Sequence, residues 1–187
     1  YEQNVRGQLH LFQGVLAAGL TPRMLIVSSN EVYGAPQPEE LPIRETKPLR
    51  PNNPYAVSKA AQDLMAVQYH ISHKLDVVVA RPFNHVGPGQ GLQYVVPSLT
   101  MRVAEIEAGT LEPVLHLGNM AAQRDFTDVR DVVAAYLALL QSGQAGEVYN
   151  VCSGVPRSVQ SVLDMLTSIA GFTVTQVSDT SKFRPVD

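Results

Sequence analysis

The chain has 187 residues, of which 45% are hydrophobic and 17% charged, a composition typical of a folded protein with a substantial core. The formal net charge is -3 and no run of Lys and Arg exceeds a pair, which argues against nucleic acid as a partner. The single cysteine, Cys152, excludes an internal disulfide framework, and no Cys/His spacing typical of zinc occurs, so we expect no metal and a reducing, cytoplasmic compartment. No apolar run reaches membrane-spanning length, and the first residues do not resemble a signal peptide, so we expect no membrane partner.

The first part of the chain predicts a helix followed by a buried strand. Apolar residues recur at helical spacing over residues 3–18, and Gly19 marks the end of that helix. Residues 23–29 form a short apolar run, which is typical of a strand covered on both faces in a parallel sheet. Six prolines between Pro36 and Pro54 then predict a long irregular loop, and loops of this length tend to be functional.

The rest of the chain repeats this alternation. Asn53 and Pro54 supply an N-cap and a first helical residue, so we expect a helix that reaches His73. Further elements are expected in the order strand, helix, extended segment, helix, strand and helix, over residues 75–82, 96–108, 113–117, 128–142, 148–151 and 158–170. Asp128 precedes an apolar helical run and is expected to cap it. The alternation predicts an α/β fold built on a doubly wound parallel sheet.

Two residues of the predicted 54–73 helix, Tyr55 and Lys59, have the spacing and chemistry of a proton-transfer pair. Tyr55 and Lys59 are at positions i and i+4 at the start of the 54–73 helix, so their side chains share one face. A nearby ammonium favours the phenolate form of a tyrosine and makes it a better proton shuttle near neutral pH. Ser29 follows the 23–29 strand, where open α/β sheets bind their ligands, and its hydroxyl could hold a carbonyl or alcohol beside the tyrosine. The three side chains predict a proton relay.

The surrounding motifs extend this set. The sequence SSNEVYG precedes the proline-rich loop, and the next strand ends in RPFN. With these motifs the chain resembles, over essentially its whole length, the extended short-chain dehydrogenases/reductases of the NAD-dependent epimerase/dehydratase family. The resemblance implies that Ser29, Tyr55 and Lys59 act together, and that Ser28 and Pro82, with Tyr55 and Lys59, contact NAD or NADP.

The resemblance also implies a domain plan and a Rossmann-like sheet. Residues 1–85 would form the catalytic part of a truncated Rossmann-like domain. Residues 86–187 would form mainly a small α/β substrate-binding lobe, with segments around 118–150 returning to the main sheet. Because a sheet that starts at residue 23 has an unfinished edge, we expect that earlier βα units are missing from the sequence.

Four residues are implied to bind a nucleotide-sugar substrate. The stretch FNHVGPGQ (83–90) resembles the family segment that enters the sugar site, which implies that Asn84 contacts the substrate. His85 is either a second contact there or a hydrogen-bonded pocket residue with no role in catalysis. Arg124, within QRDFTDV, and Arg184, near the chain end, match arginines that approach the nucleotide and its diphosphate, and a guanidinium suits phosphate oxygens. Arg184 could equally be an exposed terminal arginine.

The reaction within the family stays open. The strings RPFNHVGPGQ, AAQRDFTDVRDVV and GEVYNVCSG look most like the GDP-4-keto-6-deoxy-mannose reductases, which form GDP-rhamnose. This implies hydride transfer to C4 of a keto sugar while Tyr55 donates a proton. Glu31 occupies the position of the base in related 4,6-dehydratases, such as GDP-mannose 4,6-dehydratase, but Asn30 replaces an acid that some of them carry. A 4-epimerase is the third enzymatic interpretation.

Two further expectations concern assembly and completeness. No glycine fingerprint for a dinucleotide pyrophosphate occurs, so the chain could also be a cofactor-less fragment or a nucleotide-sugar-binding subunit without turnover. The 54–73 helix is apolar on two faces, which favours a homodimer interface or burial within one subunit. The two faces carry Val57, Ala61 and Leu64, and Ala60, Val67 and Ile71.

Overall fold

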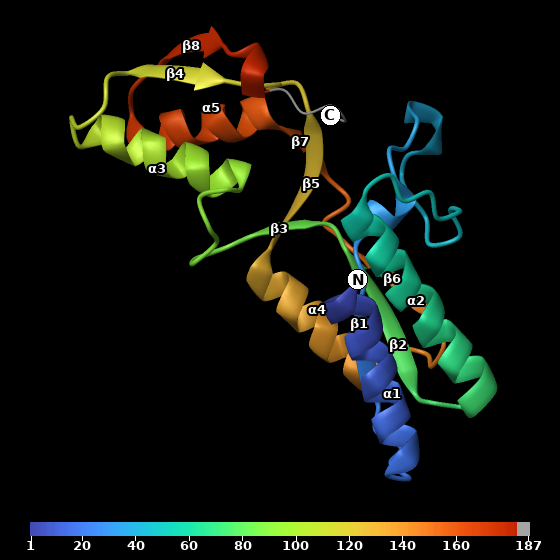
Figure 1. Cartoon of the computed structure of the whole chain (residues 1–187). Coiled ribbons are helices and arrows are strands. Elements are labelled where there is room, and N and C mark those ends of the chain that lie inside the picture. Colours follow the sequence, from blue (N-terminus) through green and yellow to red (C-terminus); the bar gives the residue numbers. More distant parts are fainter. Residues whose placement is uncertain (183–187) are drawn as a thin grey trace. The chain divides into compact units, whose positions relative to one another are not determined.

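The computed structural model describes residues 1–182 and divides the chain into two compact units (Figure 1). Unit 1 consists of Tyr1–Phe83 and Val129–Cys152, and unit 2 consists of Asn84–Asp128 and the chain from Ser153 onward. The later segment of unit 1 is therefore 129–152, and residues 123–128 before it form a strand of unit 2.

A parallel sheet of three strands, in the order β1-β2-β6, forms the centre of unit 1. The strands are β1 (Met24–Val27), β2 (Val77–Pro82) and β6 (Val148–Val151). All six residues of β2 are buried, since it lies between the other two strands and has both faces covered. The predicted strands over 23–29, 75–82 and 148–151 are confirmed, each within a few residues.

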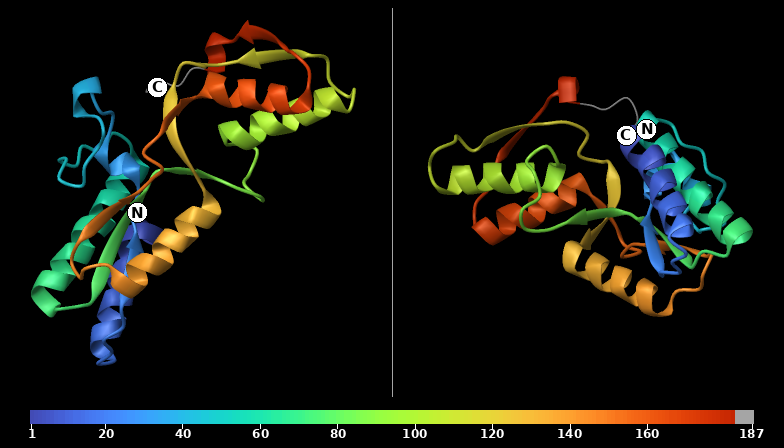
Figure 2. Two further views of the ribbon diagram at one scale, coloured as in Figure 1. Left: turned by 180° about the vertical axis from the view of Figure 1, so that it is seen from behind. Right: turned by 60° about the horizontal axis from the view of Figure 1, so that its bottom comes forward.

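Helices cover both faces of this sheet (Figures 1 and 2). They are α1 (Gly7–Ala17), which follows a π-helical turn at Glu2–Arg6, α2 (Pro54–His73) and α4 (Val129–Ser142). One core cluster joins Phe12 of α1 and Ala66 of α2 to Val79. A second joins Val132 of α4 to Ala80. Because successive strand residues point to opposite faces, Val79 and Ala80 place α1 and α2 on one face and α4 on the other, which confirms the doubly wound α/β fold.

Helix α2 has well-defined ends. The side chain of Asn53 accepts a hydrogen bond from Ala56 N (2.8 Å), and Pro54 occupies the first helical position. The helix stops at Lys74, which adopts the left-handed conformation (φ 57°). The loop before α2 contains two 3-10 turns, Asn30–Tyr33 and Pro38–Glu40, and packs through Ile43 and Leu49 onto Val32, Tyr33 and Ala60.

Unit 2 combines short strands with two helices. A three-stranded sheet has the order β3-β5-β7, from Asn84–Val86, Gln123–Asp128 and Pro156–Ser158, and β4 (Val114–Leu117) pairs in parallel with β8 (Thr175–Ser178). Helices α3 (Val95–Glu107) and α5 (Val159–Ala170) enclose a core that includes Leu99, Leu115 and Leu163. A final 3-10 turn spans Thr180–Lys182. Both helices and β4 match the predicted elements.

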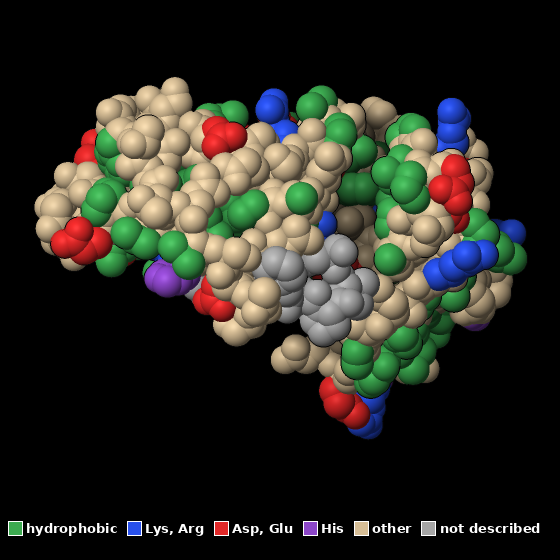
Figure 3. Space-filling model, turned by 90° about the horizontal axis from the view of Figure 1, so that it is seen from above, with side chains coloured by type: hydrophobic (Ala, Val, Ile, Leu, Met, Phe, Trp, Pro, Cys, Tyr) green, Lys and Arg blue, Asp and Glu red, His purple; other side chains and the backbone are tan. Residues whose placement is uncertain are grey.

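The surface offers no single region of like charge in the view of Figure 3, where Lys and Arg side chains are spread among neutral ones. Within residues 1–182, none of the helices combines the length and the apolar character needed to cross a membrane.

Candidate active site

Ser28 and Ser29 lie at the carboxyl end of β1 and are both buried, with 2% and 7% of their surface exposed. Ser29 begins the 3-10 turn Asn30–Tyr33, and its Oγ accepts a hydrogen bond from Glu31 N (3.2 Å). Ser28 N donates to Ala80 O (2.7 Å), but its hydroxyl has no hydrogen-bond partner among residues 1–182. A buried hydroxyl without a partner is costly, so Ser28 Oγ is suited to meet a ligand.

Tyr55 and Lys59 occupy the first turns of α2, beside this strand end. Lys59 Nζ donates a hydrogen bond to Val27 O (2.9 Å), which fixes the ammonium at the carboxyl end of β1. Burial lowers the pKa of Lys59, because the charged form loses water. The Tyr55 side chain remains 49% exposed. Through Val27 the structure brings the lysine to the strand that carries Ser29.

Pro82, the last predicted residue of the cofactor set, ends the neighbouring strand β2. Ala80 of β2 pairs with Val27 of β1, so Pro82 lies at the same edge of the sheet as the two serines. It is buried and pairs with Val151 on its other side. Since open parallel sheets bind ligands at this edge, the residues fit the nicotinamide end of a dinucleotide. They do not supply the glycine turn that holds its pyrophosphate.

Glu31 lies two residues beyond Ser29, with an exposed side chain. Its Oε2 accepts a hydrogen bond from Asn53 Nδ2 (2.9 Å), and Asn53 is the residue that caps α2. The carboxylate is therefore held next to the start of α2.

A buried polar network behind the site was not predicted from the sequence. Arg81 forms a two-bond ion pair with Asp63 of α2 (Nε–Oδ2 2.7 Å, Nη2–Oδ1 2.9 Å) and also donates to Tyr33 Oη (2.8 Å) and Glu45 O (3.1 Å). Tyr33 Oη in turn donates to Asn150 Oδ1 (2.8 Å). The signal in the sequence was an arginine in an otherwise apolar strand, because a buried guanidinium requires an acidic partner.

The network shifts the pKa of two of its members. Burial acts to lower the pKa of Arg81, but the hydrogen bonds and charges of Asp63 and Tyr33 outweigh it, so the pKa is raised. Burial raises the pKa of Tyr33, against the opposing effect of Arg81. Arg81 is thus a permanent cation, and Tyr33 a neutral phenol that both donates and accepts.

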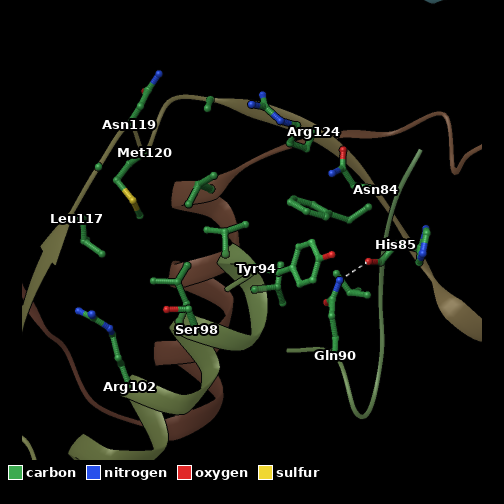
Figure 4. A pocket seen from close by; sticks show the side chains of 18 of the residues that line it. Asn84, His85, Gln90, Tyr94, Ser98, Arg102, Leu117, Asn119, Met120 and Arg124 are labelled. Atoms are coloured by element: carbon green, nitrogen blue, oxygen red, sulfur yellow. Dashed lines mark hydrogen bonds between the residues drawn. The ribbon is translucent and has the colours of Figure 1, made fainter. Parts of the chain in front are cut away.

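Unit 2 contains a cavity of about 370 Å³, a volume in the range of small-molecule sites (Figure 4). Arg102 of α3 lies at one end of the view, and Arg124 of β5 lies with Asn84 at the other, with the Tyr94 ring between them. His85 also lines the cavity, and its backbone oxygen accepts a hydrogen bond from Gln90 Nε2 (3.0 Å). Two guanidinium groups and an aromatic ring suit a phosphorylated ligand with a flat group.

Three of the four predicted substrate residues line this cavity: Asn84, His85 and Arg124. The fourth, Arg184, lies outside the described residues. Arg102, Tyr94 and Asn119 were not predicted. Tyr94 occupies the N-cap position of α3 and Arg102 lies eight positions later, within the helix. No sequence motif singles out this pair. Residues 1–182 contain no cluster of three or more His, Cys, Asp or Glu side chains that could hold a metal.

Solved structures with the same fold define the class. The Pseudomonas aeruginosa structure described as RMD complexed with NADPH superposes with a TM-score of 0.92 at 40% identity, covering 98% of this chain and 61% of that one. A putative epimerase from Burkholderia cenocepacia superposes with a TM-score of 0.85 at 39% identity, covering 98% of this chain and 58% of that one. The chain therefore has the fold of the extended epimerase/dehydratase enzymes, as the resemblance implied.

The sequence comparisons place the chain within one family. The family model described as GDP-mannose 4,6 dehydratase matches residues 1–185, and the chain belongs to this family. GDP-6-deoxy-D-mannose reductase of Pseudomonas aeruginosa is 41% identical over 181 residues, which are 97% of this chain and 60% of the relative. GDP-mannose 4,6-dehydratase of Vibrio cholerae is 33% identical over 171 residues, 90% of this chain and 45% of the relative. The chain thus spans about half to three fifths of the length of these relatives.

Proposed function

We propose that this protein is a nucleotide-sugar oxidoreductase that reduces the C4 keto group of a GDP-4-keto-6-deoxy-hexose with NAD(P)H. The observation that carries the proposal is the hydrogen bond from Lys59 Nζ to Val27 O, because it joins the Tyr55 helix to the strand that carries Ser29. The 41% identity to a GDP-6-deoxy-D-mannose reductase supports the choice of substrate.

In the proposed reaction each residue has a defined role. A bound reduced nicotinamide supplies the hydride. Ser29 Oγ donates a hydrogen bond to the C4 carbonyl oxygen and polarises it, and Tyr55 Oη donates a proton to that oxygen as it becomes an alkoxide. Lys59 holds the cofactor ribose and keeps a positive charge beside the tyrosine. Ser28, whose hydroxyl lacks a partner, and Pro82 contact the nicotinamide.

The unit 2 cavity is proposed to bind the nucleotide end of the substrate. Arg102 and Arg124 match the diphosphate, since a guanidinium fork complements phosphate oxygens. Asn84 and His85 are proposed to contact the sugar, and Arg184 the diphosphate. The ring of Tyr94 provides a flat apolar surface for the base.

A 4,6-dehydratase is the second candidate, and Glu31 favours it. A carboxylate held beside the catalytic helix can remove a ring proton, as the base of such a reaction must. Asn30, whose amide cannot act as an acid, argues against it. The two reactions differ in cofactor use, because the reductase consumes reduced cofactor and the dehydratase recycles it.

The test is the Tyr55→Phe variant, assayed for NADPH oxidation with a GDP-4-keto-6-deoxy-hexose. Removal of the proton donor is expected to lower kcat by about 10²-fold to 10⁴-fold. Tyr69→Phe, on the same helix but packed against Phe12, is the matched control and is expected to keep full activity. Undiminished hydride transfer in Tyr55→Phe would overturn the mechanism. Conversion of a GDP-sugar without NADPH consumption would favour the dehydratase or an epimerase, and failure to bind cofactor would favour a binding subunit without turnover.

We also propose that the protein acts in the cytoplasm as a homodimer that pairs through α2. Val57, Leu64 and Ile71 are 40%, 61% and 64% exposed, and their spacing of seven residues puts them on one stripe of the helix. By its exposure and spacing, Ile71 therefore belongs with Val57 and Leu64 and not with the buried face of Ala60, to which the sequence pattern assigned it. Ala60, on another face, is buried within the subunit, so the subunit itself covers only part of the apolar surface of α2. An exposed apolar stripe of this kind is suited to pack against a second copy.

A further inference from the structure

The Asn53 side chain makes three hydrogen bonds, one through its oxygen and two through its nitrogen. Its Oδ1 accepts from Ala56 N (2.8 Å) and caps α2, while its Nδ2 donates to Glu31 Oε2 (2.9 Å). The oxygen thus serves the helix, and the nitrogen serves the carboxylate and, at a longer 3.2 Å, Asn52 Oδ1. Neither serine nor aspartate, the other common N-cap residues, offers an oxygen acceptor and an amide donor together.

Glu31 is connected to the serine of the site in turn. Its backbone N donates to Ser29 Oγ (3.2 Å), so a continuous path runs from Ser29 through Glu31 and Asn53 to the first turn of α2. Tyr55 lies in that turn, two residues after Asn53. The hydrogen bond from Lys59 to Val27 joins the same strand end to α2 one turn further along the helix. The hydrogen bonds of Asn53 therefore hold the turn of α2 that carries Tyr55.

We propose that Asn53 is a positioning residue: its amide fixes the Glu31 carboxylate against the cap of α2 and thereby sets the placement of Tyr55 relative to Ser29. The inference rests on the proposed function, in which Tyr55 and Ser29 act on one oxygen. Asn53 is assigned no contact of its own with substrate or cofactor. Its effect on turnover is transmitted through Glu31.

The decisive variant is Asn53→Asp. Aspartate caps a helix as well as asparagine, so α2 keeps its N-cap, but the donor that faced Glu31 becomes a second carboxylate. The hydrogen bond is replaced by repulsion, and we expect kcat to fall about tenfold, the effect of about 1.4 kcal/mol, with a smaller change in KM. Thermal unfolding should stay near that of the unmodified protein. Asn52→Asp is the matched control, because it adds the same charge one residue earlier but keeps both the Asn53 donor and an oxygen at residue 52 that can accept from it.

A double-mutant cycle with Glu31→Gln separates positioning from capping. In Glu31→Gln/Asn53→Asp the hydrogen bond is restored with exchanged roles, since the new glutamine amide donates and the new carboxylate accepts. The tenfold penalty of Asn53→Asp should therefore nearly vanish when it is measured relative to Glu31→Gln alone. This ratio is informative even if Glu31 also takes part in chemistry. An equal penalty in both backgrounds would overturn the proposal, because Asn53 would then act independently of Glu31.

A spectroscopic readout tests the contact without turnover. In a ¹H–¹⁵N correlation spectrum, the side-chain amide signals of Asn53, assigned by their loss in Asn53→Asp, should move in Glu31→Ala while the helical content stays unchanged. Unmoved signals would refute the contact. If the signals move but no NADPH is consumed by the unmodified protein, the contact stands and the proposed reduction fails, so the two failures are distinguishable.

Discussion

At the scale of single residues, Lys59 combines a charge with partial burial. Its lowered pKa means that the unfolded chain holds the proton more tightly than the folded one. The ionised lysine therefore opposes folding below its folded pKa, and stability contributed by this residue rises as the pH climbs from there toward the unfolded value of about 10.4. The ammonium is retained despite this cost in stability, because it donates the hydrogen bond to Val27 O at the end of β1.

The variant Lys59→Met tests this linkage. Methionine carries no proton, so the stability difference between the variant and the unmodified protein should favour the variant most near neutral pH and shrink on the alkaline side. Urea unfolding at about pH 7 and about pH 10 measures it. A difference for Lys59→Met that stays constant with pH would contradict the argument.

The Arg81–Asp63 pair gives a second prediction at this scale. Both side chains are almost fully buried, at 5% and 1% exposure. Arg81→Met leaves the Asp63 carboxylate without its partner, and we expect a loss of about 3–5 kcal/mol in the free energy of unfolding. Replacing both, as Arg81→Met with Asp63→Leu, should recover much of that loss, because no buried charge remains. Denaturant unfolding decides, and a double variant as unstable as the single one would argue against an uncompensated charge as the cause.

The sequence predicted some site residues and not others for a physical reason. Ser29, Tyr55 and Lys59 were proposed from the end of an apolar strand, from helical spacing and from the motifs around them. The network around Arg81 could not be predicted in this way, because Tyr33, which accepts from Arg81, donates to Asn150, and these two residues are 117 positions apart and meet only when β6 joins the sheet. No local pattern encodes that meeting.

At the scale of elements, Asp125 fastens β5 to the turn before β7. One carboxylate oxygen accepts from Ser153 N (2.9 Å) and Ser153 Oγ (2.8 Å), and the other accepts from Gly154 N (2.7 Å). Gly154 has φ +75°, a backbone conformation that favours glycine. The hydrogen bonds of Asp125 hold this turn against β5. The neighbouring Arg124, which lines the unit 2 cavity, is held on the same strand.

Asp125→Ala should lower the free energy of unfolding by about 1–3 kcal/mol, because two backbone N–H groups lose their acceptor. Asp125→Asn should lower it less, since an amide oxygen still accepts from one side. Both values come from denaturant unfolding. Asp131→Ala, at the exposed start of α4, is the control and is expected to change stability by under about 0.5 kcal/mol. Equal stability of the Asp125 and Asp131 variants would exclude the proposed fastening.

Elements were predictable in proportion to their length and apolar character. The helices α2, α3, α4 and α5 and the strands of unit 1 were all predicted, since each has a cap, a helical period or a continuous apolar run. The strands β3, β5, β7 and β8 were not, because they contain few buried residues and their patterns are those of polar loops. Their pairing is decided by tertiary contacts rather than by local preference.

At the scale of the whole molecule, the proposed dimer can be tested by a substitution in α2. Leu64→Glu places a charge in the middle of the α2 stripe, and burying that charge against a second copy is costly, so the dimer should dissociate. Light scattering of the two proteins measures the mass directly. Leu20→Glu, at a position with 58% exposure outside the stripe, should leave the mass unchanged. A monomeric mass for the unmodified protein would remove the dimer proposal.

The division of unit 1 into two stretches of chain sets an order of events during translation. Strand β2 leaves the ribosome early, but the strand that pairs with its free edge, β6, is made only after all of Asn84–Asp128. Until then the nascent chain presents an apolar strand with unpaired backbone groups, a known hazard for aggregation. The hydrogen-bond network of Arg81 is likewise incomplete until Asn150 has been made, because Tyr33, which accepts from Arg81, donates to Asn150. A chain released before residue 148 would therefore be a natural client for chaperones or proteases rather than a smaller folded protein.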